Sequence, residues 1–557
     1  MTDRHTARTA TTSRTTTGQP SRRGTGPLSG TGTLVRFMLR RDRIKLPAWV
    51  GGLGLFVMYI GAALPQLAPT EKDLVAAVQM LEQPIGRMFA GPGYGLDAIT
   101  YERFFAGGYI LYLFTLAALM NIMLITRHTR VEEQSGRAEL VRANVTGRHA
   151  ALTAALIVAG ITNTLAAIVV SGLAVANDFA VTGSVLVGAA VGLTGMAFAG
   201  ITAVTVQLTE YSRAAAGLAG MVLGAAFVLR ALGDMIAVGG SALSWLSPLG
   251  WGSQTAPYVL DRWWPLLLHV GLAALTVTAA FRLQGRRDLG AGLMAARSGR
   301  AEAKPSLGTP WGLARRLQRS AAVAWGGAIV LIGVVDGLFT QVMVDSAAEL
   351  PEAMQDMFGV GAIALGYLAF LAVLSGYLTA AYAVYAIQSL RAEEQHGRAE
   401  AVLATPTSRS AWAGSHLGVI ALFACVIMVA AGALTGLAAS GVTGDWSLLW
   451  ETTWAHLNLI PAVLLILAIC ALLFGWVPAL VGPVGWTLVG LMVLVGNFGD
   501  LLALPEWLVN LSPLSHPAEL PVEDFQVMPL VVLLVLGALA TALGLWGLRR
   551  REVTGRS

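Results

Sequence analysis

The sequence is poor in charge, in lysine and in cysteine, and each shortage excludes a class of protein. Only 12% of its 557 residues are charged, whereas soluble domains usually carry about 25%. The two cysteines, Cys425 and Cys470, lie in apolar runs, which indicates buried thiols and not a disulfide-stabilised secreted fold. The three lysines follow Ile44, Glu71 and Ala303, so none follows a glycine as the phosphate-binding lysine of a P-loop does. The sequence therefore predicts neither a soluble enzyme nor an ATP site of its own.

Long apolar runs, by contrast, recur along the whole sequence. Hydrophobic residues make up 55% of the chain, and the mean hydropathy is +0.66. A helix of about 20 apolar residues crosses the hydrocarbon core of a bilayer. The runs are continuous and do not alternate with polar residues, which excludes a membrane β-barrel and predicts an all-α polytopic membrane protein. Twelve transmembrane helices are expected, at 46–64, 104–126, 150–175, 180–208, 213–238, 264–283, 321–343, 363–390, 411–438, 454–474, 477–499 and 528–548.

Arginine clusters at the ends of these runs predict the topology. The net charge is +5 and the pI about 9.3, but the basic residues flank apolar runs at 36–45, 282–319 and 549–556. That placement is typical of cytoplasmic loops and speaks against nucleic-acid binding. The loops at 345–356 and 506–524 carry acidic residues and no lysine or arginine. We therefore expect a multi-pass plasma-membrane protein with both termini in the cytoplasm.

Two stretches that precede a first span mix apolar residues with arginine. Residues 34–41 and 311–317 have the composition of helices that lie in the membrane interface, although basic flanks of the next span would look the same. Residues 1–30 are rich in Thr, Ser, Arg and Gly and are expected to form a disordered cytoplasmic tail. Residues 291–310 are expected to form a cytoplasmic linker.

The most informative feature is an internal repeat. Residues 130–148 return at 391–409, at an offset of 261 without a gap, and twelve of the nineteen positions are identical. Weaker echoes at nearly the same offset pair 246–249 with 511–514 and 286–288 with 550–552. The sequence therefore predicts two parallel six-span units, at 31–290 and 311–557.

The repeated stretch is a loop, and loops usually diverge faster than the elements they join. Because this loop is retained while the spans differ, we expect it to contact a partner that presents the same surface twice. Glu133 with Arg137, and Glu394 with Arg398, lie four residues apart and are expected to pair on a short exposed helix. The alternative is a solvated helix with ion pairs of its own.

The second copy resembles the coupling loop of ABC-2 type permeases, which reads roughly E-x-x-x-G-x-x-E-x-L-x-A-T-P-x-S-R. Val402 takes the place of the leucine. The matching residues are Glu393, Gly397, Glu400, Ala404, Thr405, Pro406, Ser408 and Arg409. The first copy matches at Glu132, Gly136, Glu139, Ala143 and Arg148 and departs from the family at Asn144 and Val145. The two-unit layout is similar to that of the actinobacterial exporters of polyketide antibiotics.

This resemblance implies a fold, a partner and a function. The fold is that of ABC-2, type V exporter-like, permeases, and the partner is a separate ATP-binding-cassette ATPase, in two copies, that binds ATP and Mg. No cofactor is expected in this chain itself. The implied function is export of a hydrophobic or amphipathic small molecule, such as a drug, a polyketide antibiotic or a lipid-like compound, by alternating access. The expected docking residues are Glu132, Glu133, Gly136, Arg137, Glu139, Arg148, Glu393, Glu394, Gly397, Arg398, Glu400, Thr405, Pro406 and Arg409.

Aromatic residues on spans two and eight are candidates for the substrate path, by analogy with the family. They are Phe104, Phe105, Tyr109, Tyr112, Tyr367, Phe370 and Tyr377. Such residues more often serve in packing or in the aromatic belt at the membrane surface.

Three ionisable residues fall within the apolar runs. Arg230 and Asp234 lie four apart and are expected to form a structural ion pair, whereas Asp336 has no local partner and is a candidate proton or cation site. The histidines show no metal-ligand spacing. Two other functions stay open. An ion-coupled secondary multidrug transporter would need coupling residues beyond Asp336, and a non-transporting immunity or assembly component would bind without moving a substrate.

Overall fold

The computed structural model describes residues 26–82, 84–143, 146–288, 290–294, 302–345, 363–498 and 505–551. Every regular element among them is a helix, and twelve stretches are long and apolar enough to cross a membrane. The predicted all-α polytopic fold and the predicted number of spans are therefore confirmed. The spanning stretches are Lys45–Gln66, Ile110–Gln134, Ala150–Ala176, Val181–Leu208, Ser212–Ile236, Leu266–Gln284, Pro310–Asp345, Ile363–Gln395, Arg409–Thr443, Ser447–Trp476, Pro478–Gly496 and Val527–Arg550.

The chain divides into two compact units, residues 1–69 with 86–297 and residues 70–85 with 298–557. The first unit is built around α10 (Val181–Leu208), which packs most extensively against three other long helices. These are α6 (Ile110–His128), α9 (Ala150–Ala176) and α14 (Leu266–Gln284). Its remaining long helices are α2 (Lys45–Leu67) and α11 (Ser212–Ile236).

Small residues let these helices approach closely. A Cβ on Gly188 of α10 would meet Ser171 Oγ at 2.1 Å, and one on Gly195 would meet Asn163 Oδ1 at 2.1 Å. Asn163 and Asn121 exchange two hydrogen bonds of 2.9 Å between α9 and α6. Close small-residue contacts and buried side-chain amides are the usual means by which membrane helices associate, since lipid supplies no hydrophobic drive between them.

In the second unit α18 (Ile363–Gln395) is in contact with α15, α20, α22 and α23. The long helices of this unit are α15 (Pro310–Leu338), α20 (Arg409–Thr443), α22 (Ile460–Trp476), α23 (Val481–Phe498) and α25 (Val527–Arg550). The shorter α21 (Ser447–Asn458) leads into α22. A Cβ on Gly475 would lie 2.0 Å from the carbonyl oxygen of Gly544, so α22 and α25 also cross at glycines.

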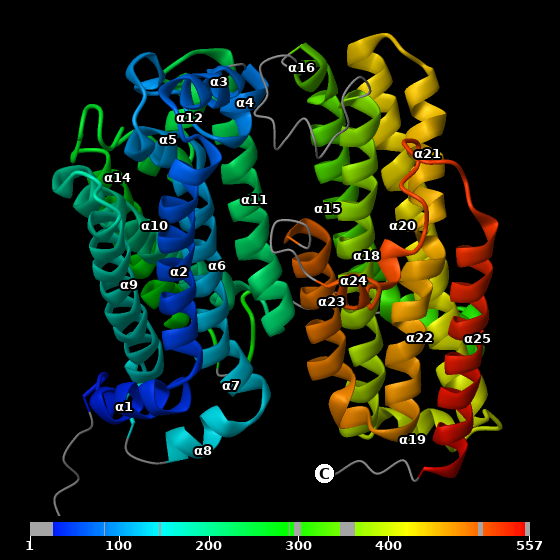
Figure 1. The fold of residues 1–557 in the computed structure, drawn as a ribbon. Helices are drawn as coiled ribbons and strands as arrows, with labels where there is room; N and C mark the ends of the chain where they lie inside the picture. Colours follow the sequence, from blue (N-terminus) through cyan, green and yellow to red (C-terminus); the bar gives the residue numbers. More distant parts are fainter. Residues whose placement is uncertain are drawn as a thin grey trace, which may run out of the picture. The chain divides into compact units, whose positions relative to one another are not determined.

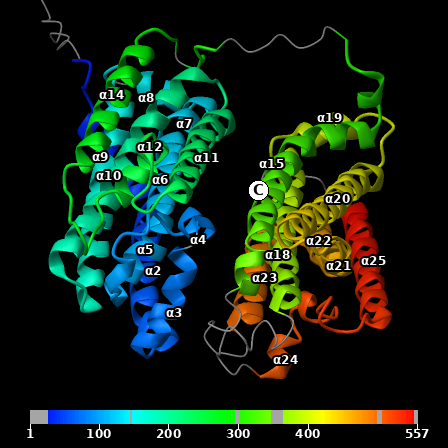
Figure 2. The same ribbon diagram turned by 90° about the horizontal axis from the view of Figure 1, so that it is seen from above.

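Short helices close the two ends of each bundle (Figures 1 and 2). At one end of the first unit lie α1 (Thr31–Arg41), α7 (Arg130–Gln134) and α8 (Arg137–Ala143), and at one end of the second lies α19 (Arg398–Leu403). We call this the loop end of each unit. The opposite, or cap, end carries α5 (Tyr101–Gly108) and α12 (Ala242–Trp245) in the first unit, and α16 (Thr340–Asp345) in the second. The remaining short helices are α3 (Glu71–Glu82), α4 (Pro84–Phe89), α13 (Pro248–Ser253) and α24 (Glu506–Val509).

Three details differ from the predicted spans. Span two begins at Ile110 and not at 104, because the Thr100 side chain caps α5 and the chain leaves helical geometry at Tyr109 before α6 starts. Span ten consists of α21 and α22, which meet at Leu459. Of the two stretches expected before a first span, 34–41 lies in the separate helix α1, whereas 311–317 forms the first turns of the continuous α15.

Candidate functional site

The repeated loop has the same backbone break in both units. In the first, Gly136 separates α7 from α8 with φ of 72°, and in the second Gly397 separates α18 from α19 with φ of 70°. L-residues with a Cβ lose about 1–2 kcal/mol in this left-handed region. Nothing lies within 4 Å of a Cβ built on either glycine, so the backbone angle and not crowding favours glycine there.

An exposed ion pair bridges each break. Arg137 Nε lies 3.1 Å from Glu132 Oε2, and Arg398 Nη2 lies 2.8 Å from Glu393 Oε1. The hydrogen bonds to Glu393 raise the pKa of the Arg398 guanidinium above its ordinary value. The predicted pairs of Arg137 with Glu133, and of Arg398 with Glu394, are wrong. The helix stops at the glycine, so residues four apart across the break no longer face each other.

The inner glutamate of each loop instead contacts the end of the last span of its own unit. Arg287, just after α14, donates to Glu133 Oε1 at 2.7 Å, and Arg551, just after α25, donates to Glu394 Oε1 at 2.7 Å. Glu394 is only 5% exposed. Arg130, fully buried, adds a second contact to Glu133 at 2.6 Å.

The arginine that closes each repeated loop contacts the same helix end. Arg148 donates to the carbonyl oxygen of Gly285 at 2.6 Å, and Arg409 donates to that of Arg551 at 2.6 Å. A cation that binds the free carbonyls at a helix C-terminus is favoured by the helix dipole as well as by the hydrogen bond. The loop and the end of the last span are thus tied together at two points in each unit. We call these contacts the clamp.

Sequence reasoning missed the two clamp arginines, Arg287 and Arg551. Their signal was present as the echo of 286–288 in 550–552, which lies at a slightly different offset from the loop repeat. Part of the repetition therefore has an internal structural reason. Six of the predicted docking residues are exposed without a part in the clamp: Arg137, Glu139, Arg398, Glu400, Thr405 and Pro406. Of the other predicted docking residues, Glu132, Glu393, Gly136, Gly397 and Arg409 are partly buried, and Arg148 is exposed but tied into the clamp.

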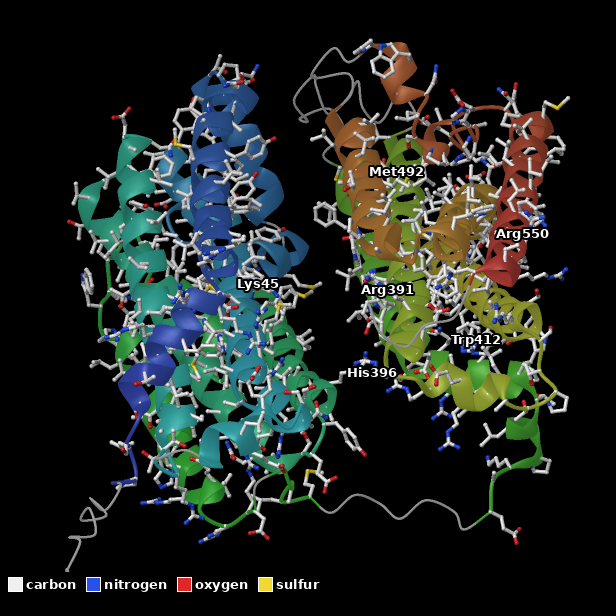
Figure 3. The ribbon with its side chains drawn as sticks, turned by 90° about the horizontal axis from the view of Figure 1, so that it is seen from below. Lys45, Arg391, His396, Trp412, Met492 and Arg550 are labelled. Atoms are coloured by element: carbon white, nitrogen blue, oxygen red, sulfur yellow. The ribbon has the colours of Figure 1, made fainter. Side chains whose placement is uncertain are left out.

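The two loops also differ in their surroundings. In the first unit α1 covers the loop, where Arg41 forms an ion pair with Glu132. A cavity of about 100 Å³ lies between α1, the loop and the end of α14. In the second unit a surface hollow lies beside α19 and is lined by Glu400, Leu403, Thr407 and Arg409, among others. Figure 3 labels Arg391 and His396 on either side of the end of α18, beside this loop.

The seven aromatic candidates for a substrate path differ in how deeply they are buried. Phe105 is fully buried against Phe179, with ring centroids 5.4 Å apart. Tyr367 and Tyr377 are also buried. Phe104, Tyr109 and Phe370 are half-buried, and Tyr112, at 48%, is the most exposed of the seven. Phe104 and Phe105 lie on α5 at the cap end and not on a spanning helix.

The predicted pairing of Arg230 with Asp234 on α11 is confirmed. Arg230 Nη1 lies 3.2 Å from Asp234 Oδ2, and both residues are fully buried. Ser244 donates to the other carboxylate oxygen of Asp234 at 2.6 Å, and Arg87 donates to the Asp234 carbonyl at 3.0 Å. This network joins α4, α11 and α12, so its position indicates a structural role at the cap end.

Asp336, the third predicted intramembrane charge, lies on α15. Its carbonyl oxygen accepts a hydrogen bond of 3.1 Å from the Tyr367 hydroxyl. Among the residues that the structure describes, no ion pair involves its carboxylate, and no three His, Cys, Asp or Glu side chains are grouped as metal ligands would be.

The comparisons with known proteins agree with this architecture. A family model described as the C-terminal domain of the multidrug efflux system permease Rv1217c matches the chain twice, at residues 32–283 and 307–549. The multidrug efflux system permease protein Rv1217c of Mycobacterium tuberculosis (strain ATCC 25618 / H37Rv) is 38% identical over 539 residues, which cover 95% of this chain and 96% of that protein. These matches are consistent with the expected ABC-2 type permease. The chain is a multi-pass membrane permease that belongs to the family of the multidrug efflux system permease Rv1217c.

Proposed function

We propose that this chain is the membrane subunit of an ATP-driven exporter of hydrophobic or amphipathic small molecules. The family supports the permease role, and the name of the relative, a multidrug efflux system permease, supports drugs as the substrate class. The observation that carries the ATP-driven part is the clamp, which occurs in both units with an exposed outer face on each loop. A separate ATPase in two copies, which binds ATP and Mg, fits two such faces.

The clamp supports a route by which force on a loop reaches the membrane. A push on α8 or α19 would pass to the helix before it, α7 or α18, and from there to the last span of the same unit through Glu133 and Arg287, or through Glu394 and Arg551. ATP binding would bring the two ATPase copies together, move both loops, and change which side of the bilayer the substrate path opens to. In this scheme the loop ends and both termini face the cytoplasm, as the arginine placement predicts.

The test is co-purification with the ATPase and measurement of its hydrolysis rate. Glu139 and Glu400 are exposed and lie outside the clamp. We expect Glu139→Arg with Glu400→Arg to abolish complex formation, because a reversed charge opposes whatever faces each loop. Glu523→Arg at the cap end is the matched control, since it makes the same change on an exposed glutamate far from the loops in sequence. An intact, ATPase-coupled complex in the double variant would disprove docking at the loops.

The competing function is ion-coupled secondary transport, and Asp336 is the observation that favours it. Measurement of drug export from cells distinguishes the ATP-driven mechanism from the ion-coupled one. An ATP-driven exporter continues when the proton gradient is collapsed and stops when ATP is depleted, whereas an ion-coupled transporter behaves in the opposite way. Asp336→Asn should leave export intact if the first mechanism operates.

A further inference from the structure

A second pocket, apart from the loop face and from the aromatic candidates, lies at the loop end of the first unit. It has a volume of about 290 Å³ and lies between the start of α2, the last turns of α6 and the start of α11. Its walls are apolar and include Trp49, Met120 and Met123. Three basic residues, Lys45, Arg127 and Arg213, lie around it. Figure 3 shows Lys45 at the point where α2 begins.

Two of the three cations have no counter-charge in the part of the chain that the structure describes. Neither Lys45 nor Arg213 has an ion pair or a side-chain hydrogen bond among the described residues. Arg127 is paired with Asp42 at 2.9 Å, and Asp42, the single carboxylate of the lining, also contacts His128 at 2.7 Å. The pocket therefore keeps an excess of positive charge beside an apolar wall.

Buried polar atoms in the lining also lack partners. Thr126 is only 6% exposed, and neither its hydroxyl nor Nε of Arg127 has a hydrogen-bond partner among the residues with described positions. Such buried groups usually have a partner, because leaving them unsatisfied destabilises the protein. In addition the Ser212 amide at the start of α11 donates to Gln134 Oε1, and no N-cap side chain binds the amides that follow it.

The second unit offers an internal comparison. An offset of 276 residues relates Asp42 to Gln318 and Trp49 to Trp325, and the loop offset of 261 relates His128 to Ser389. Gln318 contacts Ser389 as Asp42 contacts His128 in the first unit. At these offsets Lys45 corresponds to Ala321 and Arg127 to Gln388. The second unit, which has no basic residue at these two positions, shows that the fold itself does not require Lys45 and Arg127 there.

We propose that this pocket binds the phosphate headgroup of an anionic membrane lipid, with the acyl chains leaving along the exposed apolar faces of α2 and α6. A volume of this size is at the small end of ligand pockets and suits a headgroup better than a whole lipid. Met123 on α6 and Leu55 on α2 are 60% and 69% exposed and supply the apolar path for the chains. Basic pockets between membrane helices are the usual sites for anionic headgroups.

The site also touches the repeated loop. Val131 of α7 lines the pocket, and the Ser212 amide donates to Gln134 Oε1 of α7 at 3.2 Å. A bound lipid would therefore contact α7, α6 and α11 at once and hold the first loop in place. The second unit carries Ala321 and Gln388 where the first has Lys45 and Arg127, so we expect this effect in the first unit.

Native mass spectrometry of the full chain in detergent tests the site, with phosphatidylglycerol, phosphatidylcholine and glycerol 3-phosphate as probes. We expect Lys45→Ala with Arg213→Ala to bind phosphatidylglycerol roughly 30-fold more weakly, since each basic residue beside an anionic headgroup contributes about fivefold. Both side chains are exposed, so folding should be unaffected. Arg316→Ala with Arg319→Ala removes the same charge from the exposed start of α15 and should bind as the unchanged protein does.

Three results would overturn the proposal. Unchanged binding in the Lys45 and Arg213 variant would show that the lipid sits elsewhere. An equal loss in the Arg316 and Arg319 variant would show only general attraction to positive charge. Equally strong binding of glycerol 3-phosphate, which has no acyl chain, would mean that the apolar walls take no part and that the site is one for free phosphate esters.

Discussion

Each repeated loop contains two adjacent glutamates with different surroundings. Glu393 faces the exposed Arg398, which is 55% accessible, whereas the neighbouring Glu394 is buried against Arg551. An exposed ion pair contributes about 0–1 kcal/mol because water and salt screen it. A buried, hydrogen-bonded charge contributes about 1.5–3 kcal/mol. Replacing Glu394 should therefore lower the stability of the loop much more than replacing the adjacent Glu393.

We expect Glu394→Gln to lower the local stability of the second loop by about 2 kcal/mol, because the Arg551 guanidinium loses its charged acceptor. Glu393→Gln, the matched control, should cost about 0.5 kcal/mol. Amide hydrogen exchange over residues 396–404 measures the difference, since these amides exchange through local opening. The Glu394 variant should exchange roughly 30-fold faster there. Equal rates in the two variants would show that the clamp does not stabilise the loop.

The sequence predicted the loops but not their contacts, and the reason is distance along the chain. Glu394 and Arg551 are 157 residues apart, and Glu133 and Arg287 are 154 apart. Helical spacing can only propose partners three or four residues away, and here it proposed pairs that the glycine break prevents. Arg230 with Asp234 was predictable because that pair lies within one uninterrupted helix.

At the scale of elements, the apolar runs predicted the twelve spans to within a few residues at most ends. The larger errors occur where a helix stops inside an apolar run. Hydropathy could not locate the stop at Tyr109 or at Leu459, because it is averaged over a long window in which a single polar residue such as Asn458 has little weight, and the backbone change itself leaves no trace in it. For the same reason it could not show that residues 311–317 continue into α15 while α1 stays separate from α2.

Gly397, between α18 and α19, gives a prediction about stability. Its substitution by alanine should destabilise the protein, whereas the same substitution at a control glycine should stabilise it. Gly397→Ala should destabilise the loop by about 1 kcal/mol, because alanine is strained at φ of 70° even though space is open around it. Gly414→Ala lies within α20, also with open space, and should stabilise by about 0.5–1 kcal/mol because alanine favours helix. Gly397→Asn should fall between the unchanged protein and Gly397→Ala, since asparagine tolerates the left-handed region. Hydrogen exchange of α19 and of the first turn of α20 reports both effects.

A gain of stability in Gly397→Ala would contradict this expectation and would mean that α18 runs on into α19 when it can. That outcome would also change the docking surface, because Arg398 would then face Glu394 in the helical spacing that the sequence first predicted. The same test applies to Gly136, where φ is 72° and the space is equally open.

At the scale of the whole molecule, the two units repeat one plan with unequal details. Each ties its repeated loop to its last span by a glutamate–arginine pair. Among the described residues, the first unit has a separate α1 over its loop and a basic pocket beside it, whereas in the second unit the corresponding stretch continues into α15. Two identical ATPase copies would therefore meet similar loops in different surroundings. The two units would then move differently when ATP binds. This asymmetry would come from the permease and not from the ATPase.

Topology is the whole-molecule prediction that cysteine labelling can decide. The chain has two free cysteines, Cys425 partly buried and Cys470 buried, which alanine can replace to give a cysteine-free background. Ser135→Cys at the loop end and Asp97→Cys at the cap end then place one exposed thiol at each end of the first unit. A membrane-impermeant maleimide added to intact cells should label the Asp97 variant only, and permeabilised cells should label both.

The second unit supplies the independent half of this experiment. Glu400→Cys on α19 and Asp445→Cys before α21 are exposed positions at its two ends. Because parallel units place both repeated loops on one side of the membrane, labelling in intact cells should reach the Asp445 variant and spare the Glu400 variant. Labelling of Glu400→Cys together with protection of Ser135→Cys would mean that the units are inverted. An ATPase that acts from the cytoplasm could then reach only one loop, and the mechanism proposed for this permease would fail.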